Sequence, residues 1–203
     1  MPLLFLIRHG TTQWNAEARI QGHANCPLNE AGRAQSQCVV RALAQHPIQA
    51  VYSSDLERAF ETARAIAESH QVIPKTDRRL REASFGEWEG LTITEISNRW
   101  PAEAAAWRAD SLHHRAPGGE TLEAVQLRVG QVISAITNKF PEEAVAIVGH
   151  SGSLRAAVAY ALGITPVVSR LLHFDNGSLT TLEYVHGRFS LRCLNDICHL
   201  RRV

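Results

Sequence analysis

The feature that most restricts the fold is a pair of short, uninterrupted apolar runs, 3–7 and 144–148, far apart in the chain. Apolar residues that do not alternate with polar ones are typical of a strand buried on both faces. A sheet of such strands must be covered by helices on each side. We therefore predict an α/β fold, a three-layer α/β/α sandwich around a mostly parallel central sheet.

The remaining sequence alternates between helix and strand patterns. One apolar stripe at three- and four-residue spacing predicts a helix over 120–140; it comprises Leu122, Val125, Val129, Val132 and Ile136. Further helices are expected over 29–45, 55–69 and 151–162, and further strands over 50–52, 171–174 and 179–185. The order Ser54-Asp55-Leu56-Glu57 has the form of a capping box, and Asn176-Gly177 is typical of a turn between the last two strands.

One segment, residues 84–118, does not follow this alternation. It holds three of the four tryptophans, two prolines and the pair His113-His114. We interpret it as a helical cap insertion over one end of the sheet. The length of 203 residues then suits a single domain, 1–203, that carries this cap.

Composition excludes several classes of partner. Lys and Arg total 21 against 20 for Asp and Glu, so the net charge of +1 favours neither a nucleic acid nor a membrane surface. The apolar stretch 156–164 is far shorter than the ~20 residues of a membrane span, and the apolar start 1–7 lacks the basic region of a signal peptide. Four cysteines are too few for a disulfide scaffold, which favours reduced thiols and a cytoplasmic location. The sequence is compatible with a homodimer.

We expect neither a metal nor a cofactor. Cys193, Cys198 and His199 lie close together in the sequence, but no zinc-type spacing is repeated. The chain also has no glycine loop of the kind that cradles a nucleotide triphosphate. Any charge that acts on a ligand must therefore come from side chains that the fold gathers locally.

Two of the expected strands end at a histidine. The first leads into Arg8-His9 and the third into Gly149-His150, while the second leads through two serines to Arg58. Ligands of open α/β sheets bind beyond the carboxyl ends of the strands. If these strands are neighbours, two histidines and two arginines converge in one pocket.

Such a group suits a phosphomonoester. Guanidinium groups bind phosphate bidentately and stay charged, and surrounding cations favour a neutral imidazole that can attack phosphorus. The reaction also needs a carboxyl group that protonates the leaving oxygen and later activates water. Glu82, Glu87 and Glu89 are the local candidates, and composition does not choose among them.

An ordered series of motifs resembles the histidine phosphatase superfamily, the phosphoglycerate-mutase-like group with an Arg-His-Gly signature. The resemblance covers nearly the whole chain and is closest to the small bacterial phosphatases. It rests on Leu6-Ile7-Arg8-His9-Gly10-Thr11-Thr12, Trp14-Asn15, Gln21-Gly22, Pro27-Leu28, Gly32, Ser53-Ser54-Asp55-Leu56-Glu57-Arg58-Ala59, Leu80-Arg81-Glu82, Phe85-Gly86-Glu87-Trp88-Glu89-Gly90, Pro117-Gly118-Gly119-Glu120 and Val148-Gly149-His150.

The resemblance implies a role for each site residue. His9 is similar to the nucleophile that becomes phosphohistidine, Arg8 and Arg58 to the phosphate clamp, and His150 to a further phosphate-binding group. Glu82 matches the general acid, in preference to Glu87 and Glu89. Asn15 matches a phosphate contact, and Gln21 and Gly22 match a loop near the substrate. Ser151 departs from the family, where many members have glycine, but its N–H is still expected to reach phosphate.

The expected function is hydrolysis of small phosphomonoesters through a phosphohistidine. Dedicated α-ribazole-phosphate or phosphoserine phosphatase activity is an alternative, because specificity should lie in the cap, 84–118. A cofactor-dependent phosphoglycerate mutase is disfavoured, because the resemblance implies a longer, more basic insertion for a mutase than this chain has between Glu82 and His150. An inactive relative that only binds phosphorylated ligands is a further alternative, disfavoured because Glu82 is present.

Overall fold

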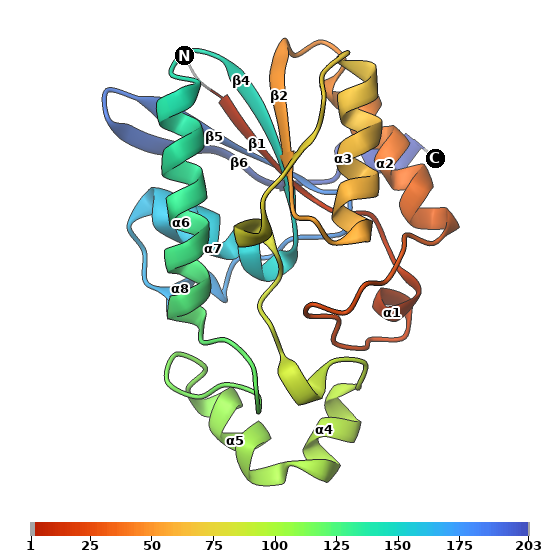
Figure 1. Cartoon of the computed structure of the whole chain (residues 1–203), viewed down its shortest axis with the longest axis vertical. Coiled ribbons are helices and arrows are strands. Elements are labelled where there is room, and N and C mark those ends of the chain that lie inside the picture. The colour runs from red at the N-terminus through yellow and green to blue at the C-terminus, as the bar shows by residue number, and fades with distance from the viewer. Residues whose placement is uncertain (1–2, 203) are drawn as a thin grey trace.

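The strands form one sheet of six in the order β3-β2-β4-β1-β5-β6 in the computed structural model, which describes residues 3–202 (Figure 1). The neighbours β2–β3, β2–β4 and β1–β4 are parallel, whereas β5 and β6 join antiparallel at one edge. The strands are β1 (Leu3–Arg8), β2 (Ile48–Ser53), β3 (Lys75–Thr76), β4 (Ala144–Gly149), β5 (Leu179–Val185) and β6 (Arg188–Asp196). The predicted mostly parallel sheet is confirmed.

Helices cover both faces of this sheet. The longer ones are α2 (Glu30–Leu43), α3 (Glu57–Ser69), α6 (Leu122–Lys139) and α7 (Ser151–Leu162), and the short ones are α1 (Gln13–Ala16) and α8 (Pro166–Ser169). Successive residues of β1 point to opposite faces: Leu4 and Leu6 pack with α6 and α7, while Phe5 and Ile7 pack with α2 and α3. The uninterrupted apolar run of β1 thus supplies two cores at once.

Helix α6 begins close to its predicted start because Thr121 caps it. The Thr121 hydroxyl accepts a hydrogen bond from the N–H of Ala124, as helix N-caps commonly do. The predicted stripe supplies buried residues that face the sheet, among them Val125, Val129 and Ile136.

The predicted capping box at Ser54 is wrong. Helix α3 begins at Glu57, and Leu56 precedes it without a side-chain cap. The N–H of Ser54 instead donates to the carbonyl of Val148 at 3.1 Å, which extends the pairing of β2 with β4. Because Ser54 continues the strand geometry, the helix can begin only after it.

The expected strand over 171–174 is also wrong, and β6 was missed. Side chains hold the 171–174 segment: Arg155 Nε donates to the carbonyl of Leu172 at 2.8 Å, and an Arg8 terminal nitrogen donates to that of Phe174 at 2.6 Å. The turn at Asn176-Gly177 therefore precedes β5 without linking two strands. Strand β6 is an edge strand with many exposed polar residues, which hides its pattern.

Residues 84–118 lie at the end of the molecule farthest from the N-terminus, where α4 (Ile93–Arg99) and α5 (Pro101–Ala109) follow a 3₁₀ turn at Gly86–Trp88 (Figure 1). They have a small core of their own around Trp88, Ile96 and Ala104. The other 3₁₀ turns are Arg78–Leu80 and Cys198–Arg202. None of the helices within residues 3–202 is long and apolar enough to cross a membrane.

Candidate active site

The central strands bring His9 and His150 together. Arg8 at the end of β1 is paired in register with Gly149 at the end of β4, and each histidine follows directly. The two imidazole centroids are 5.0 Å apart and the rings are tilted by 61°. Both side chains are buried. The convergence expected at neighbouring strand ends is therefore present.

His9 has its ring orientation set by its own loop. Its Nδ1 lies 2.7 Å from the carbonyl oxygen of Gly10. A carbonyl only accepts, so Nδ1 carries the proton and donates, which leaves the lone pair on Nε2. Burial, followed by the charges of Arg58 and Arg8, holds the pKa of His9 well below its usual value. The ring is thus neutral at physiological pH, with Nε2 available to attack an electrophile.

His150 has no hydrogen-bond partner for either ring nitrogen among residues 3–202, although both atoms are buried. Burial lowers its pKa well below the usual value, and the charges of Arg58 and Arg8 act in the same direction. An unpaired buried polar group costs about 1–3 kcal/mol. An anion between the two histidines would supply a partner for His150 and for the cations beside it.

Arg58 and Arg8 are anchored by part of their guanidinium groups only. Arg58 is fully buried in the first turn of α3, and its terminal nitrogens donate to the carbonyls of Ala24 at 2.7 Å and Gly22 at 2.8 Å. Arg8 donates to the carbonyl of Phe174. The Nε atoms of both arginines are buried without a partner in the described part of the chain. Donors thus remain free for an oxyanion.

Glu82 is the carboxylate that reaches this edge of the sheet. Its Oε2 accepts from the N–H of Gly152 at 3.0 Å, in the first turn of α7, and its Oε1 accepts from Ala83 at 2.8 Å. A Cβ on Gly152 would lie 2.2 Å from Glu82 Oε1, so only glycine allows this approach. Glu87 is exposed, and Glu89 accepts from the backbone N–H groups of His23 and Phe85.

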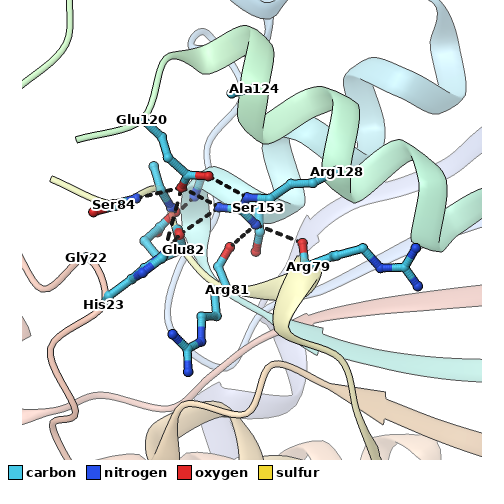
Figure 2. A network of polar contacts seen from close by, with 12 residues as sticks. Gly22, His23, Arg79, Arg81, Glu82, Ser84, Glu120, Ala124, Arg128 and Ser153 are labelled. Carbon is cyan, nitrogen blue, oxygen red and sulfur yellow. Dashed lines mark hydrogen bonds and ion pairs between the residues drawn. The ribbon is translucent and has the colours of Figure 1, made fainter. Parts of the chain in front are cut away.

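A network not foreseen from the sequence holds the backbone around Glu82 (Figure 2). Arg128 of α6 donates to the carbonyls of Arg79, Arg81 and Glu82 at 2.7–2.8 Å. It also forms two hydrogen bonds of 2.8 Å with the carboxylate of Glu120. Every N–H group of the guanidinium is therefore directed at this loop or at Glu120.

His23 and Ser84 complete this network. The Nε2 of His23 donates to the carbonyl of Glu82 at 2.9 Å, and the N–H of Ser84 donates to Glu120 at 2.9 Å. Figure 2 shows Arg128 and His23 approaching the Glu82 backbone from opposite sides. No sequence motif indicates such a network, because backbone carbonyls are acceptors at every position.

The remaining predicted residues lie around this centre in different ways. Asn15 Oδ1 accepts from the N–H and the hydroxyl of Thr12, both at 3.1 Å, and Gln21 Oε1 accepts from the same hydroxyl at 3.0 Å. Gly22 contributes the carbonyl that holds Arg58. Ser151 lines a cavity next to Glu82.

The site offers cationic and N–H donors and does not offer a metal-binding cage. Within residues 3–202 no three His, Cys, Asp or Glu side chains are grouped so that they could hold a metal ion. The buried Arg58, the half-buried Arg8, two neutral imidazoles and one carboxylate match the needs of a tetrahedral oxyanion and a leaving oxygen.

Comparison with known proteins agrees with this geometry. The model of the histidine phosphatase superfamily (branch 1) matches residues 4–197. Phosphoglycerate mutase-like protein 4 of Arabidopsis thaliana is 35% identical over 97% of this chain and 86% of its own. Glucosyl-3-phosphoglycerate phosphatase of Mycobacterium tuberculosis is 34% identical over 89% of this chain and 84% of its own.

A solved structure is similar over almost the same extent. The putative alpha-ribazole-5'-P phosphatase from Escherichia coli superposes with a TM-score of 0.90 at 29% identity, covering 96% of each chain. Sequence, fold and the ordered motifs thus agree from the first strand to the last. The chain belongs to the histidine phosphatase superfamily.

Proposed function

We propose that this chain hydrolyses small phosphomonoesters through a phosphohistidine formed on His9. The observation that carries the proposal is the neutral, buried His9, whose Nδ1 donates to Gly10 and whose Nε2 is left free between Arg8, Arg58 and His150. The chain is a hydrolase that acts on phosphate monoesters, as its family and its phosphatase relatives support.

In the first step, Nε2 of His9 forms a bond to phosphorus while the bond from phosphorus to the ester oxygen breaks. Glu82, as the protonated acid, gives its proton to the departing oxygen. Arg8 and Arg58 bind the oxygens of the phosphoryl group, and His150 adds a neutral N–H donor. Asn15 would contact the same group from the loop after β1.

In the second step, Glu82 is a carboxylate and accepts a proton from water. The water oxygen bonds to phosphorus, the bond from phosphorus to Nε2 breaks, and inorganic phosphate leaves. Glu82 is again an acid and His9 again neutral, so the cycle closes without a metal ion or a cofactor. The N–H of Gly152 holds Glu82 throughout, and Ser151 borders the space through which the leaving group departs.

Hydrolysis is favoured over mutase transfer because the segment from Glu82 to His150 contains few cations that could hold a bisphosphate. The relatives' names give α-ribazole-5'-P and glucosyl-3-phosphoglycerate as candidate substrates. Phosphoserine is a third candidate. Residues 84–118 are proposed to act as the cap that selects among these. We place the enzyme in the cytoplasm with reduced thiols, acting on small molecules and not on nucleic acid, either alone or as a homodimer.

The test is phosphate release from a panel of phosphomonoesters in the presence of a chelator. Wild type should turn over several esters, His9→Ala should turn over none, and His114→Ala, an exposed histidine of the cap segment, should match wild type. Rapid acid-free quenching with a radiolabelled ester should trap a base-stable, acid-labile phosphoprotein in wild type only. Full activity of His9→Ala would contradict the mechanism.

A further inference from the structure

A β-turn at residues 175–178 lies against the loop after β1 that carries the proposed nucleophile, His9. The turn is closed by a hydrogen bond of 3.0 Å from the N–H of its last residue, Ser178, to the carbonyl of its first. Gly177, its third residue, has a φ of 73°, which glycine adopts without strain. Asn176, the second residue, therefore has a fixed place beside the loop.

The side-chain amide of Asn176 donates to three acceptors on the segment that follows β1. Its Nδ2 lies 3.0 Å from the carbonyl oxygen of His9, 3.3 Å from that of Gly10 and 3.3 Å from Oδ1 of Asn15. An NH2 group has two hydrogens, so the two longer contacts share one of them. Every partner is an acceptor, because Asn15 Oδ1 also accepts from the N–H of Thr12. These neighbours determine which end of the Asn176 amide faces the loop.

One of these acceptors, the carbonyl of Gly10, is the group that orients His9. It accepts from Nδ1 of His9 at 2.7 Å, and this bond leaves the lone pair on Nε2. The N–H at the other end of the same peptide group, that of Thr11, donates to Gln35 at 2.8 Å. Among the described residues, Asn176 is the side chain that holds the carbonyl end beside His9 itself. The direction of this carbonyl therefore depends on Asn176.

The same amide also directs the side chain of Asn15. Oδ1 of Asn15 accepts from the N–H of Thr12 at 3.1 Å and from Asn176 at 3.3 Å. Both donors bind the oxygen of the Asn15 amide, so its Nδ2 points away from them and can donate to a phosphoryl oxygen. A single side chain thus acts on two groups of the proposed site.

The turn is anchored independently of the Asn176 side chain, by the last strand and the last 3₁₀ turn. Oδ1 of Asn195 accepts from the N–H of Asp175 at 2.6 Å, and its Nδ2 donates to the carboxylate of Asp175 at 2.8 Å. The Nε2 of His199 donates to the carbonyl of Gly177 at 2.9 Å. Because these bonds do not involve the Asn176 amide, the turn should keep its place when that amide is removed.

We propose that Asn176 is a positioning residue that fixes the reactive tautomer and orientation of His9 and the direction of the Asn15 amide. Its N–H donors are used within the protein, so it acts through these two residues and not on the substrate. The inference rests on the proposed phosphatase function. It adds to that site a residue that the sequence indicated only as part of a turn.

The first test is kinetic. Asn176→Leu keeps the size of the side chain and removes its hydrogen bonds to the loop. The single-turnover rate of phosphoenzyme formation should fall roughly 10- to 100-fold, because a displaced nucleophile slows attack on phosphorus. Alkyl phosphates and p-nitrophenyl phosphate should lose the same factor, since the change affects the attack and not the protonation of the leaving oxygen.

A second measurement does not depend on turnover. ¹⁵N NMR of the histidine rings in the resting protein reports which nitrogen of His9 carries the proton, and the signal is identified by its absence from His9→Ala. Wild type should show a proton on Nδ1 that exchanges slowly with water. In Asn176→Leu this proton should exchange roughly 2- to 10-fold faster, as expected for the loss of one hydrogen bond.

Asn195→Gly is the matched control. It removes two hydrogen bonds from the same turn without touching the loop, and the φ of 55° at this position suits glycine. It should keep both the rate of phosphoenzyme formation and the Nδ1 proton of wild type. Asn176→Ala provides a second variant in case leucine does not fit, and it should reproduce the losses of Asn176→Leu.

Three results would overturn the positioning role. They are a wild-type rate in a folded Asn176 variant, a lowered rate with an unchanged Nδ1 proton, and equal changes in Asn195→Gly, which would assign the effect to the whole turn. Absence of a phosphoenzyme in wild type would contradict the proposed function instead. The exchange of the Nδ1 proton would still decide whether Asn176 orients His9.

Discussion

Arg128 offers the sharpest test of how the protein positions its proposed acid. Its guanidinium makes hydrogen bonds to three backbone carbonyls around Glu82 and to both carboxylate oxygens of Glu120. Arg128→Met keeps most of the apolar stem and removes all of these bonds. The change should therefore release the loop that carries Glu82 while leaving α6 intact.

The cost to stability follows from the exposure of the pair. The side chains of Arg128 and Glu120 are 17% and 26% exposed, so water can replace part of what is lost. We expect the free energy of unfolding to fall by roughly 2–3 kcal/mol, between the values for an exposed ion pair and for a buried one. Arg33→Met is the control: it breaks an exposed pair with Glu61 at 2.8 Å and should cost less than about 1 kcal/mol.

The catalytic effect should depend on the leaving group. A displaced acid matters for an alkyl phosphate, whose oxygen needs a proton, and hardly at all for p-nitrophenyl phosphate, whose leaving group departs as a stable anion. We expect kcat of Arg128→Met to fall roughly 10- to 100-fold for alkyl esters and less than about threefold for p-nitrophenyl phosphate. Equal losses for both esters would refute the positioning role and indicate general damage to the fold.

Further predictions concern Gly152, the two buried histidines of the site, and Arg58 of the phosphate clamp. Gly152→Ala places a Cβ against Glu82. The value of kcat for alkyl phosphates should therefore fall about tenfold or more, with turnover of p-nitrophenyl phosphate little affected. Unchanged turnover of alkyl phosphates would contradict the role of this contact. His9 and His150 have lowered pKa values when folded, so the unfolded chain binds more protons and stability should fall as pH drops below about 6.5. Urea unfolding between pH 7.5 and 5.5 should show a slope of up to about 1.4 kcal/mol per pH unit for each histidine, and His150→Ala should remove its share, whereas His114→Ala should not. Arg58→Lys keeps the positive charge but loses the paired N–H donors of the guanidinium group, so inhibition by inorganic phosphate should weaken roughly tenfold or more. An unchanged inhibition constant would exclude Arg58 from the phosphate clamp.

Local patterns in the sequence were sufficient for the layered fold. The apolar run in β1 must be buried on both faces, and such a strand can lie only in the middle of a covered sheet. The same use of apolar runs to predict strands failed for residues 171–174, where side chains bind the backbone carbonyls. Arg155 and Arg8 occupy the carbonyls of Leu172 and Phe174, so an apolar stretch that resembles a strand pairs with no strand.

The sequence by itself determined which residue types follow each strand, because a strand and the residues that follow it are adjacent in the chain. Only the tertiary structure decided that β1 and β4 are neighbours in a register that sets Arg8 opposite Gly149, and hence that His9 and His150 face each other. It also decided that Glu82, rather than Glu89, lies at the N–H of Gly152. The physical reason is that hydrogen bonds to backbone carbonyls and N–H groups place these side chains. Every residue type offers the same backbone groups, so such bonds follow from the path of the chain and cannot be recognised in the sequence.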